Sequence, residues 1–298
     1  MSASELKELV ELLTSRPAPP NASVAELRER FEKLGNYLPA PAQMRSEPLD
    51  ANGVPAELVS VPGADPDRRV LYLHGGGYVI GSIDTHRTLA CNLAEACGCP
   101  VLLIDYRRAP EHPFPAQLED ALSAYEWLLD QGHEASKLAI AGDSAGGGLT
   151  VSTLVALKQR GLPMPGAGLC ISPWVDLEGI GGSMQSKAEV DPIVERGRLL
   201  KMAEWFLGGT EPRAPLAAPM YADLSGLPPL LVQVGSAETL LDDSTRLAEK
   251  ARQDGVDITL EEAPDMIHVW HLFAPMLSEG REAISRAGAF LRERTGAV

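Results

Sequence analysis

Short apolar runs separated by amphipathic stretches dominate the chain from about residue 56 onward. Most of the runs are apolar at nearly every position, which is typical of strands buried on both faces of a sheet. We expect strands at residues 56–61, 69–73, 101–104, 138–141, 169–171, 229–234 and 256–260. Helical spacing fills the intervals at about 85–97, 116–131, 145–160, 243–253 and 279–294. This alternation predicts an α/β fold with a mostly parallel sheet and helices on both of its faces.

The N-terminal part does not follow this alternation. Residues 4–15 and 24–35 have the apolar spacing of helices, and proline-rich breaks at 17–21 and 38–41 follow them. We therefore expect two short helices that pack on another part of the molecule and do not form a domain of their own.

The interval 176–222 also departs from the pattern. It shows no clear strand, but it contains several glycines and prolines and a helical stretch that includes Met202 and Phe206. Its position predicts an insertion between two strands, long enough to fold over the sheet.

Composition and charge narrow the classes of function. The chain has 298 residues, of which 45% are hydrophobic and 22% charged, as in globular proteins and unlike disordered ones. With 26 basic and 41 acidic residues, its net charge is −15, which disfavours binding to phosphate backbones and anionic lipid. We expect neither a nucleic acid nor a membrane among its partners.

The cysteines and the first residues bear on metal binding and location. Cys91, Cys97, Cys99 and Cys170 form no Cys-x-x-Cys pair, and no Cys/His spacing suits zinc. They are expected to be buried thiols in a reducing compartment. The first seven residues lack the basic start and apolar core of a secretory signal, and no apolar run approaches 18 residues. These features predict a soluble cytoplasmic protein without a metal site.

The strongest candidate for chemistry is the segment 142–146, Gly-Asp-Ser-Ala-Gly. A Gly-x-Ser-x-Gly pentapeptide is weak evidence alone, but here a buried strand leads into it and a helix follows. This is the setting of a nucleophile elbow, whose tight turn needs small residues on both sides of the serine. The helix N-terminus also favours developing negative charge. We predict that Ser144 is a nucleophile.

A serine nucleophile needs a base. In proteins with a nucleophile elbow the order along the chain is serine, then the acid, then the histidine. Of the six histidines only His268 and His271 come after Ser144. His268 directly follows the loop behind the last strand, whereas His271 lies further on in a short helical stretch. We favour His268 and keep His271 as the alternative.

The acid orients the imidazole and should follow a strand at the same edge of the sheet. Glu238 is the first carboxylate after the strand at 229–234. Asp242 and Asp243 look like the first-turn residues of the next helix, where acidic groups complement the helix dipole. We favour Glu238, with Asp242 as its main rival.

The oxyanion of an acyl-transfer intermediate requires hydrogen-bond donors. The segment 74–77, His-Gly-Gly-Gly, follows the strand at 69–73, and its glycines allow the backbone to approach a ligand closely. We predict that the N–H groups of Gly76, Gly77 and Ala145 are these donors. The histidine of the segment precedes the elbow and is expected to anchor the loop.

Together, the segments 74–77, 142–147 and 105–116 (Asp-Tyr-Arg-Arg-Ala-Pro-Glu-His-Pro-Phe-Pro-Ala) resemble the hormone-sensitive lipase family of α/β-hydrolases, in its bacterial esterase branch. The resemblance covers roughly residues 55–298. It implies an α/β-hydrolase fold with a central eight-stranded, mostly parallel sheet flanked by helices. It also implies a helical cap at 1–45 and 176–222, over a catalytic domain of 46–175 and 223–298.

The resemblance implies a carboxylesterase that acts on short- to medium-chain acyl esters without a metal or organic cofactor. One departure is visible, because the family usually places Asp-Pro where this chain has Glu238 and Thr239. A glutamate is chemically competent, so we expect Ser144 to attack the ester, His268 to transfer the proton and Glu238 to hold the imidazole.

Several features of the expected esterase stay open. Asp143, Met202 and Phe206 are candidates for the substrate pocket. A lactonase or an amidase would use the same triad, and a binding protein that resembles this family would lack the catalytic histidine. The resemblance further implies a possible homodimer, for which the strand at 256–262 could supply the contact.

Overall fold

The computed structural model describes residues 3–296 except residues 16, 18, 20, 37 and 40. The first two residues, and parts of the predicted breaks at 17–21 and 38–41, therefore lie outside the described residues.

Within the described residues, eight strands form one sheet in the order β1-β2-β4-β3-β5-β6-β7-β8. Their bounds are Arg45–Ala51 (β1), Val54–Ser60 (β2), Arg69–Leu73 (β3), Val101–Ile104 (β4), Leu138–Asp143 (β5), Ala167–Ile171 (β6), Leu230–Gly235 (β7) and Ile258–Ala263 (β8). The pairs β1–β2 and β2–β4 are antiparallel, and all other neighbours are parallel. The predicted mostly parallel sheet is confirmed.

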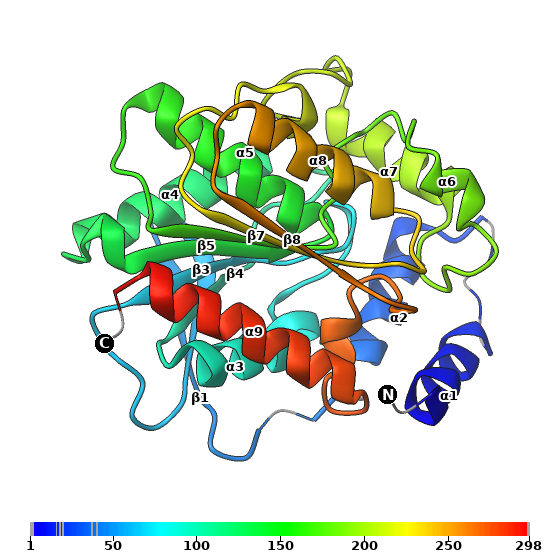
Figure 1. Cartoon of the computed structure of the whole chain (residues 1–298), viewed down its shortest axis with the longest axis horizontal. Coiled ribbons are helices and arrows are strands. Elements are labelled where there is room, and N and C mark those ends of the chain that lie inside the picture. Colours follow the sequence, from blue (N-terminus) through cyan, green and yellow to red (C-terminus); the bar gives the residue numbers. More distant parts are fainter. Residues whose placement is uncertain are drawn as a thin grey trace.

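Helices connect the strands as the alternation predicts. The α-helices are Ala3–Thr14 (α1), Val24–Asn36 (α2), Ile83–Cys97 (α3), Ala116–Asp130 (α4), Ala145–Arg160 (α5), Ser183–Ser186 (α6), Arg196–Leu207 (α7), Leu241–Gln253 (α8) and Ser278–Arg294 (α9). Short 3₁₀ turns lie at Ala135–Lys137 (η1), Pro219–Tyr221 (η2) and Trp270–Phe273 (η3). Figure 1 shows α4, α5 and α8 on one face of the sheet and α3 and α9 on the other.

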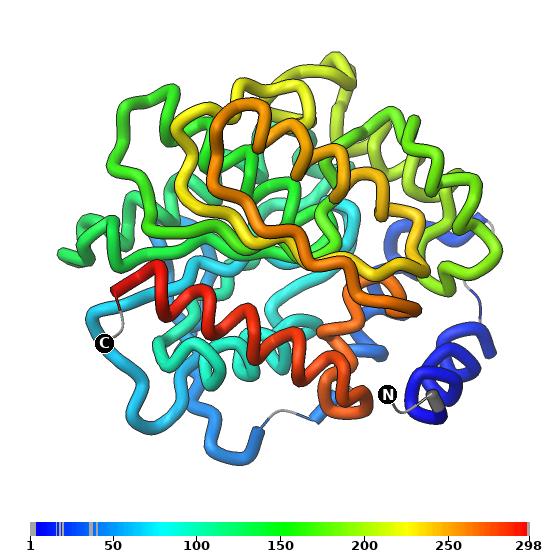
Figure 2. Tube along the Cα trace, in the orientation of Figure 1, coloured from blue at the N-terminus to red at the C-terminus, as the bar shows by residue number. Residues whose placement is uncertain are grey.

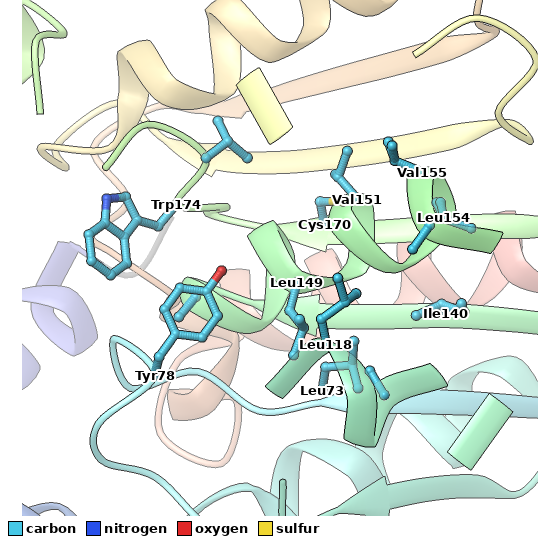
Figure 3. Close-up of a cluster of buried hydrophobic side chains, with 14 of the residues drawn as sticks. Leu73, Tyr78, Leu118, Ile140, Leu149, Val151, Leu154, Val155, Cys170 and Trp174 are labelled. Carbon is cyan, nitrogen blue, oxygen red and sulfur yellow. The ribbon is translucent and has the colours of Figure 1, made fainter. Parts of the chain in front are cut away.

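The alternation of side chains along each strand divides the core into two layers. In β3, Leu71 and Leu73 join the cluster under α4, α5 and α8, whereas Val70 and Tyr72 join the cluster under α3 and α9. Figure 3 shows part of the first cluster, where the strands β5 and β6 lie against α5. In Figure 2 the red tube of α9 runs beside α3 beneath the strands. Burial on both faces explains why these strands are apolar at nearly every position.

The strand β1 is absent from the pattern of apolar positions. Five of its seven residues are exposed, and it contains Pro48, so it carries neither the alternation nor the apolar run that the other strands show. Proline is tolerated here because β1 lies at the edge of the sheet and pairs only with β2. Pairing with a neighbour, which the local sequence does not encode, makes this segment a strand.

Two segments outside the sheet lie toward the same side of the molecule in Figure 1, namely α1 with α2, and α6 with α7. The second pair belongs to the connection from β6 to β7, residues 172–229, which we call the β6–β7 segment. Arg28 of α2 donates to the carbonyls of Val79 (2.9 Å) and Ala109 (3.0 Å), which lie in the loops after β3 and β4. Helix α2 thus contacts the loops that follow β3 and β4.

Candidate active site

Ser144 occupies a strained turn between β5 and α5. Its backbone has φ 54° and ψ −120°, a conformation that residues with a side chain rarely adopt. A Cβ at Gly142 would collide with the carbonyl of Gly146, and a Cβ at Gly146 with the carbonyl of Leu73. The turn therefore requires glycine at both positions, and this steric requirement explains the two glycines of the Gly-x-Ser-x-Gly segment.

The structure brings Ser144, His268 and Glu238 into one hydrogen-bonded line. The Nε2 atom of His268 lies 3.0 Å from the Ser144 Oγ atom, and its Nδ1 atom lies 2.5 Å from Glu238 Oε2. Both the imidazole and the carboxylate are buried. The three side chains follow β5, β7 and β8, whose ends meet at one edge because these strands are parallel.

The second oxygen of the Glu238 carboxylate is also held. Its Oε1 atom accepts hydrogen bonds from the Gly235 N–H (2.6 Å) and the Ser172 hydroxyl (2.9 Å). Asp242, the rival acid, accepts from the N–H of Ser183 instead (3.0 Å). Of the two candidate carboxylates, the structure places Glu238 against the imidazole and Asp242 at the start of α8, facing the β6–β7 segment.

The Glu238 carboxylate governs the ionisation of His268. Burial by itself lowers the pKa of the imidazole, but the negative charge and hydrogen bond of Glu238 oppose this and raise the pKa above the ordinary histidine value. Asp191 and Asp143 add smaller contributions of the same sign. The arrangement therefore stabilises an imidazolium, which is the species that forms when histidine accepts a serine proton.

The predicted oxyanion donors lie at two neighbouring segments. Gly76 and Gly77 have φ values of 113° and 60°, and in the part of the chain that the structure describes no backbone carbonyl accepts from their N–H groups. Ala145 is the first residue of α5, where an N–H has no acceptor within the helix. These N–H groups are therefore available to an added oxygen.

Asp143 is a sequence-predicted candidate for the substrate pocket, but its carboxylate binds neighbouring protein groups instead. Its carboxylate is buried and accepts hydrogen bonds from the Tyr72 hydroxyl (2.8 Å) and the Gly75 N–H (3.1 Å), while His86 Nε2 lies 3.3 Å away. Burial raises its pKa, but His86 and the Tyr72 hydrogen bond outweigh burial, so the pKa lies below the ordinary value. These contacts make Asp143 a support of the glycine loop.

His74 lies inside the same loop. Its ring stacks on Tyr106 with centroids 4.1 Å apart, and its Nδ1 atom donates to the carbonyl of Gly75 (2.8 Å). Burial, reinforced by the charge of His86, lowers the pKa of His74 to about 3. A neutral, stacked ring of this kind anchors the loop.

Met202 and Phe206 of α7 approach the glycine loop. A Cβ added at Gly77 would collide with the sulfur of Met202, so the two residues are in direct contact. The Phe206 ring stacks on Tyr78, the residue after this loop, with centroids 3.8 Å apart. Both side chains are buried. The β6–β7 segment therefore covers the loop that carries two of the predicted donors.

His271 is not part of this arrangement. Its Nε2 atom lies 2.9 Å from Gln233 Oε1, and burial lowers its pKa to about 3. The imidazole is thus held neutral beneath the sheet edge. Among the described residues, no group of three His, Cys, Asp or Glu side chains is arranged to hold a metal ion. None of the helices that these residues form has the length and hydrophobicity of a bilayer-crossing segment.

Ser172 is a site residue that the sequence analysis missed. Its hydroxyl donates to Glu238, as described, and accepts from the Val269 N–H (3.2 Å), next to the histidine. Its φ of 45° is a second strained backbone position at this edge. The sequence feature that could have identified it is its position directly after β6, just as Ser144 directly follows β5.

Known proteins are similar to this chain in both sequence and fold. A family model described as the alpha/beta hydrolase fold matches residues 70–272. An acetyl-hydrolase of Streptomyces hygroscopicus is 50% identical over 235 residues, which are 79% of each chain. A crystal structure of an esterase from the bacterial hormone-sensitive lipase family has a TM-score of 0.97 and 50% identity, and covers 99% of this chain and 100% of that one. A structure of EstE5 soaked with p-nitrophenyl butyrate has a TM-score of 0.95 and 46% identity, with the same coverage.

Proposed function

Since this chain belongs to the α/β-hydrolase family, among the esterases of the bacterial hormone-sensitive lipase branch, and is a carboxylic ester hydrolase, we propose that it cleaves short- to medium-chain acyl esters through an acyl-enzyme on Ser144. The observation that carries this proposal is the continuous line of hydrogen bonds from Ser144 Oγ through His268 to Glu238. The soaking of EstE5 with p-nitrophenyl butyrate, whose acyl group has four carbons, and the acetyl-hydrolase name of the Streptomyces relative favour short acyl groups.

In the first half of the reaction, Ser144 Oγ attacks the carbonyl carbon while His268 Nε2 takes the hydroxyl proton. The oxyanion accepts hydrogen bonds from the N–H groups of Gly76, Gly77 and Ala145. Each such donor is worth about 3 kcal/mol of transition-state stabilisation. The C–O bond to the alcohol then breaks, and His268 gives its proton to the departing oxygen.

In the second half, a water molecule gives a proton to His268 Nε2 as its oxygen attacks the acyl carbon. The bond to Ser144 Oγ breaks, the serine regains the proton, and the carboxylic acid leaves. Throughout, Glu238 accepts the Nδ1–H bond, which fixes the tautomer and stabilises the imidazolium.

The cap assignment belongs to the same proposal. We assign residues 1–45 and 176–222 to a cap over a catalytic domain of 46–175 and 223–298. The contacts of Met202 with Gly77 and of Phe206 with Tyr78 support it, because both join α7 to the segment that would carry two of the oxyanion donors. Met202 and Phe206 would therefore limit the acyl group. A homodimer through β8, which lies at the sheet edge, stays a prediction.

Ser144→Ala, assayed with 4-nitrophenyl butyrate, tests the mechanism. We expect turnover to fall by about 10⁴-fold or more in a folded protein. Ser152→Ala is the matched control, because this serine lies on α5 and its buried hydroxyl has no partner among the described residues. Undiminished turnover in Ser144→Ala would overturn the proposal.

Two further measurements separate the alternatives. A fluorophosphonate probe should label the wild type and leave Ser144→Ala unlabelled, whereas a binding protein would not react. A panel of esters, lactones and anilides should show the highest kcat/KM for esters of short acids. A preference for lactones or anilides would contradict the substrate class but keep the triad.

A further inference from the structure

Asp191 of the β6–β7 segment makes an unusually complete set of hydrogen bonds. Its Oδ1 atom accepts from the N–H groups of Ile193 (2.9 Å) and Val194 (3.0 Å). Its Oδ2 atom accepts from both the N–H (2.8 Å) and the hydroxyl (3.0 Å) of Thr239. Thr239 directly follows Glu238, so one carboxylate joins the covering segment to the turn that carries the triad acid.

A second link holds the same residue from the same side. The Ser183 hydroxyl donates to the carbonyl of Thr239 (2.6 Å), and the Ser183 N–H donates to Asp242 (3.0 Å). The N–H, hydroxyl and carbonyl of Thr239 are therefore all bound by the β6–β7 segment, and the side chain is buried. A proline at 239 would have neither the N–H nor the hydroxyl, so the contact depends on the departure from Asp-Pro noted in the sequence.

Asp191 also acts on the histidine through its charge. The groups whose charges bear on His268 are Glu238, Asp191 and Asp143, with the neutral His271 nearby. Burial lowers the pKa of His268, and the three carboxylates, led by Glu238, raise it. Among the described residues, the hydrogen-bond partners of the Asp191 carboxylate are the uncharged donors of Ile193, Val194 and Thr239. Its negative charge is therefore balanced only by neutral donors and still reaches the imidazole.

We propose that Asp191 is a positioning residue for the triad: it fixes the turn that carries Glu238 through Thr239, and its negative charge adds to that of Glu238 in acting on His268. The proposal rests on the proposed function. It makes the β6–β7 segment part of the acid–base machinery as well as a wall of the substrate pocket, so that displacement of this segment would loosen the acid.

The test compares Asp191→Asn and Thr239→Val with a matched control. Asp191→Asn removes the charge and replaces one acceptor oxygen by an amide nitrogen. Thr239→Val removes only the hydroxyl and leaves the charge in place. Glu189→Gln removes a charge two residues away, from an exposed side chain of the same segment, and is the control.

The readout is the pH profile of kcat and kcat/KM with 4-nitrophenyl butyrate, followed at the isosbestic wavelength of 4-nitrophenol. For Asp191→Asn we expect the acid limb to move to lower pH by on the order of half a unit, because the imidazolium loses a stabilising charge. We also expect kcat on the alkaline plateau to fall roughly three- to tenfold, because the acid is less well placed. Glu189→Gln should match the wild type.

Thr239→Val should lower kcat by a similar factor while the acid limb stays in place. An unmoved acid limb in Asp191→Asn would overturn the proposal, even if its thermal stability falls, since a purely structural role predicts that result. Should Asp191→Asn fail to fold, wild-type kcat in Thr239→Val overturns it instead. Failure of the proposed function is distinguishable, because Ser144→Ala would then keep its turnover.

Discussion

Replacing Glu238 by glutamine keeps the shape of the acid and changes only what its two terminal atoms can do. In the wild type, Oε1 accepts from the Gly235 N–H (2.6 Å) and the Ser172 hydroxyl, and Oε2 accepts from His268 Nδ1. The Gly235 N–H is part of the backbone and cannot turn away. The glutamine oxygen must therefore take the Oε1 position, which leaves the NH₂ group facing the imidazole.

In that orientation His268 can accept the amide hydrogen only as the tautomer whose Nε2 carries the proton, and this tautomer cannot take a proton from Ser144. The reverse orientation would set NH₂ against the Gly235 N–H and cost about 1–3 kcal/mol for an unsatisfied buried donor. The charge-assisted bond to the imidazolium, worth about 1.5–3 kcal/mol, is lost in addition. The sum, about 2.5–6 kcal/mol, corresponds to a fall of about 10²- to 10⁴-fold in kcat/KM.

The assay is kcat/KM with 4-nitrophenyl butyrate for Glu238→Gln, with thermal unfolding to show that the variant is folded. Asp242→Asn is the control, because an asparagine oxygen can still accept from the Ser183 N–H, and we expect activity within about threefold of the wild type. Activity above about a tenth of the wild-type value in Glu238→Gln would refute the reasoning. A large loss in Asp242→Asn alone would transfer the role of the acid to that residue.

The remaining predictions concern pH and the pocket. The acid limb of kcat/KM should lie above the ordinary pKa of histidine, because Glu238 raises the pKa of His268 and only the neutral imidazole is a base; a limb below that value would contradict the assignment. His271 has a pKa of about 3 when folded, so the unfolded chain binds the extra proton between pH 6.5 and 3, and stability falls as the pH decreases through this range. The free energy of unfolding, measured in urea at pH 7.5 and at pH 5, should therefore decrease by about 2 kcal/mol less in His271→Gln than in the wild type. An equal decrease in the two proteins would show that the ring is not held neutral. Met202→Ala should destabilise the protein by about 2–5 kcal/mol and raise the hexanoate-to-butyrate ratio of kcat/KM severalfold, since it opens space beside Gly77; an unchanged ratio in an ester panel would remove Met202 from the pocket.

The sequence predicts most of the fold because the central strands are buried on both faces and therefore consist of continuous apolar runs. The strand at 69–73 and the strand at 101–104 have the expected bounds, and the elbow is legible because glycine is required on both sides of Ser144. The edge strand β1 could not be predicted from its sequence, since only pairing with β2 makes it a strand.

The supporting residues of the site escape prediction for a related reason. Ser172, Asp191 and Tyr72 act through partners that lie between 48 and 97 positions away along the chain. A serine after a strand, an aspartate in a glycine-rich segment and a strand tyrosine each have ordinary local roles. Their contribution comes from what the sheet places beside them, which neither periodicity nor spacing records.

The carboxylate of Asp143 has one more consequence. It belongs to the nucleophile turn, yet it binds the first amide of the glycine loop and the phenol of the adjacent strand β3. In the proposed mechanism, the turn with the nucleophile and the loop with two of the oxyanion donors are thus joined by this buried carboxylate, in addition to the pairing of β3 with β5. We expect the two segments to move together in thermal fluctuations. The distance between them, where an ester carbonyl would bind, should then vary less than the surrounding structure.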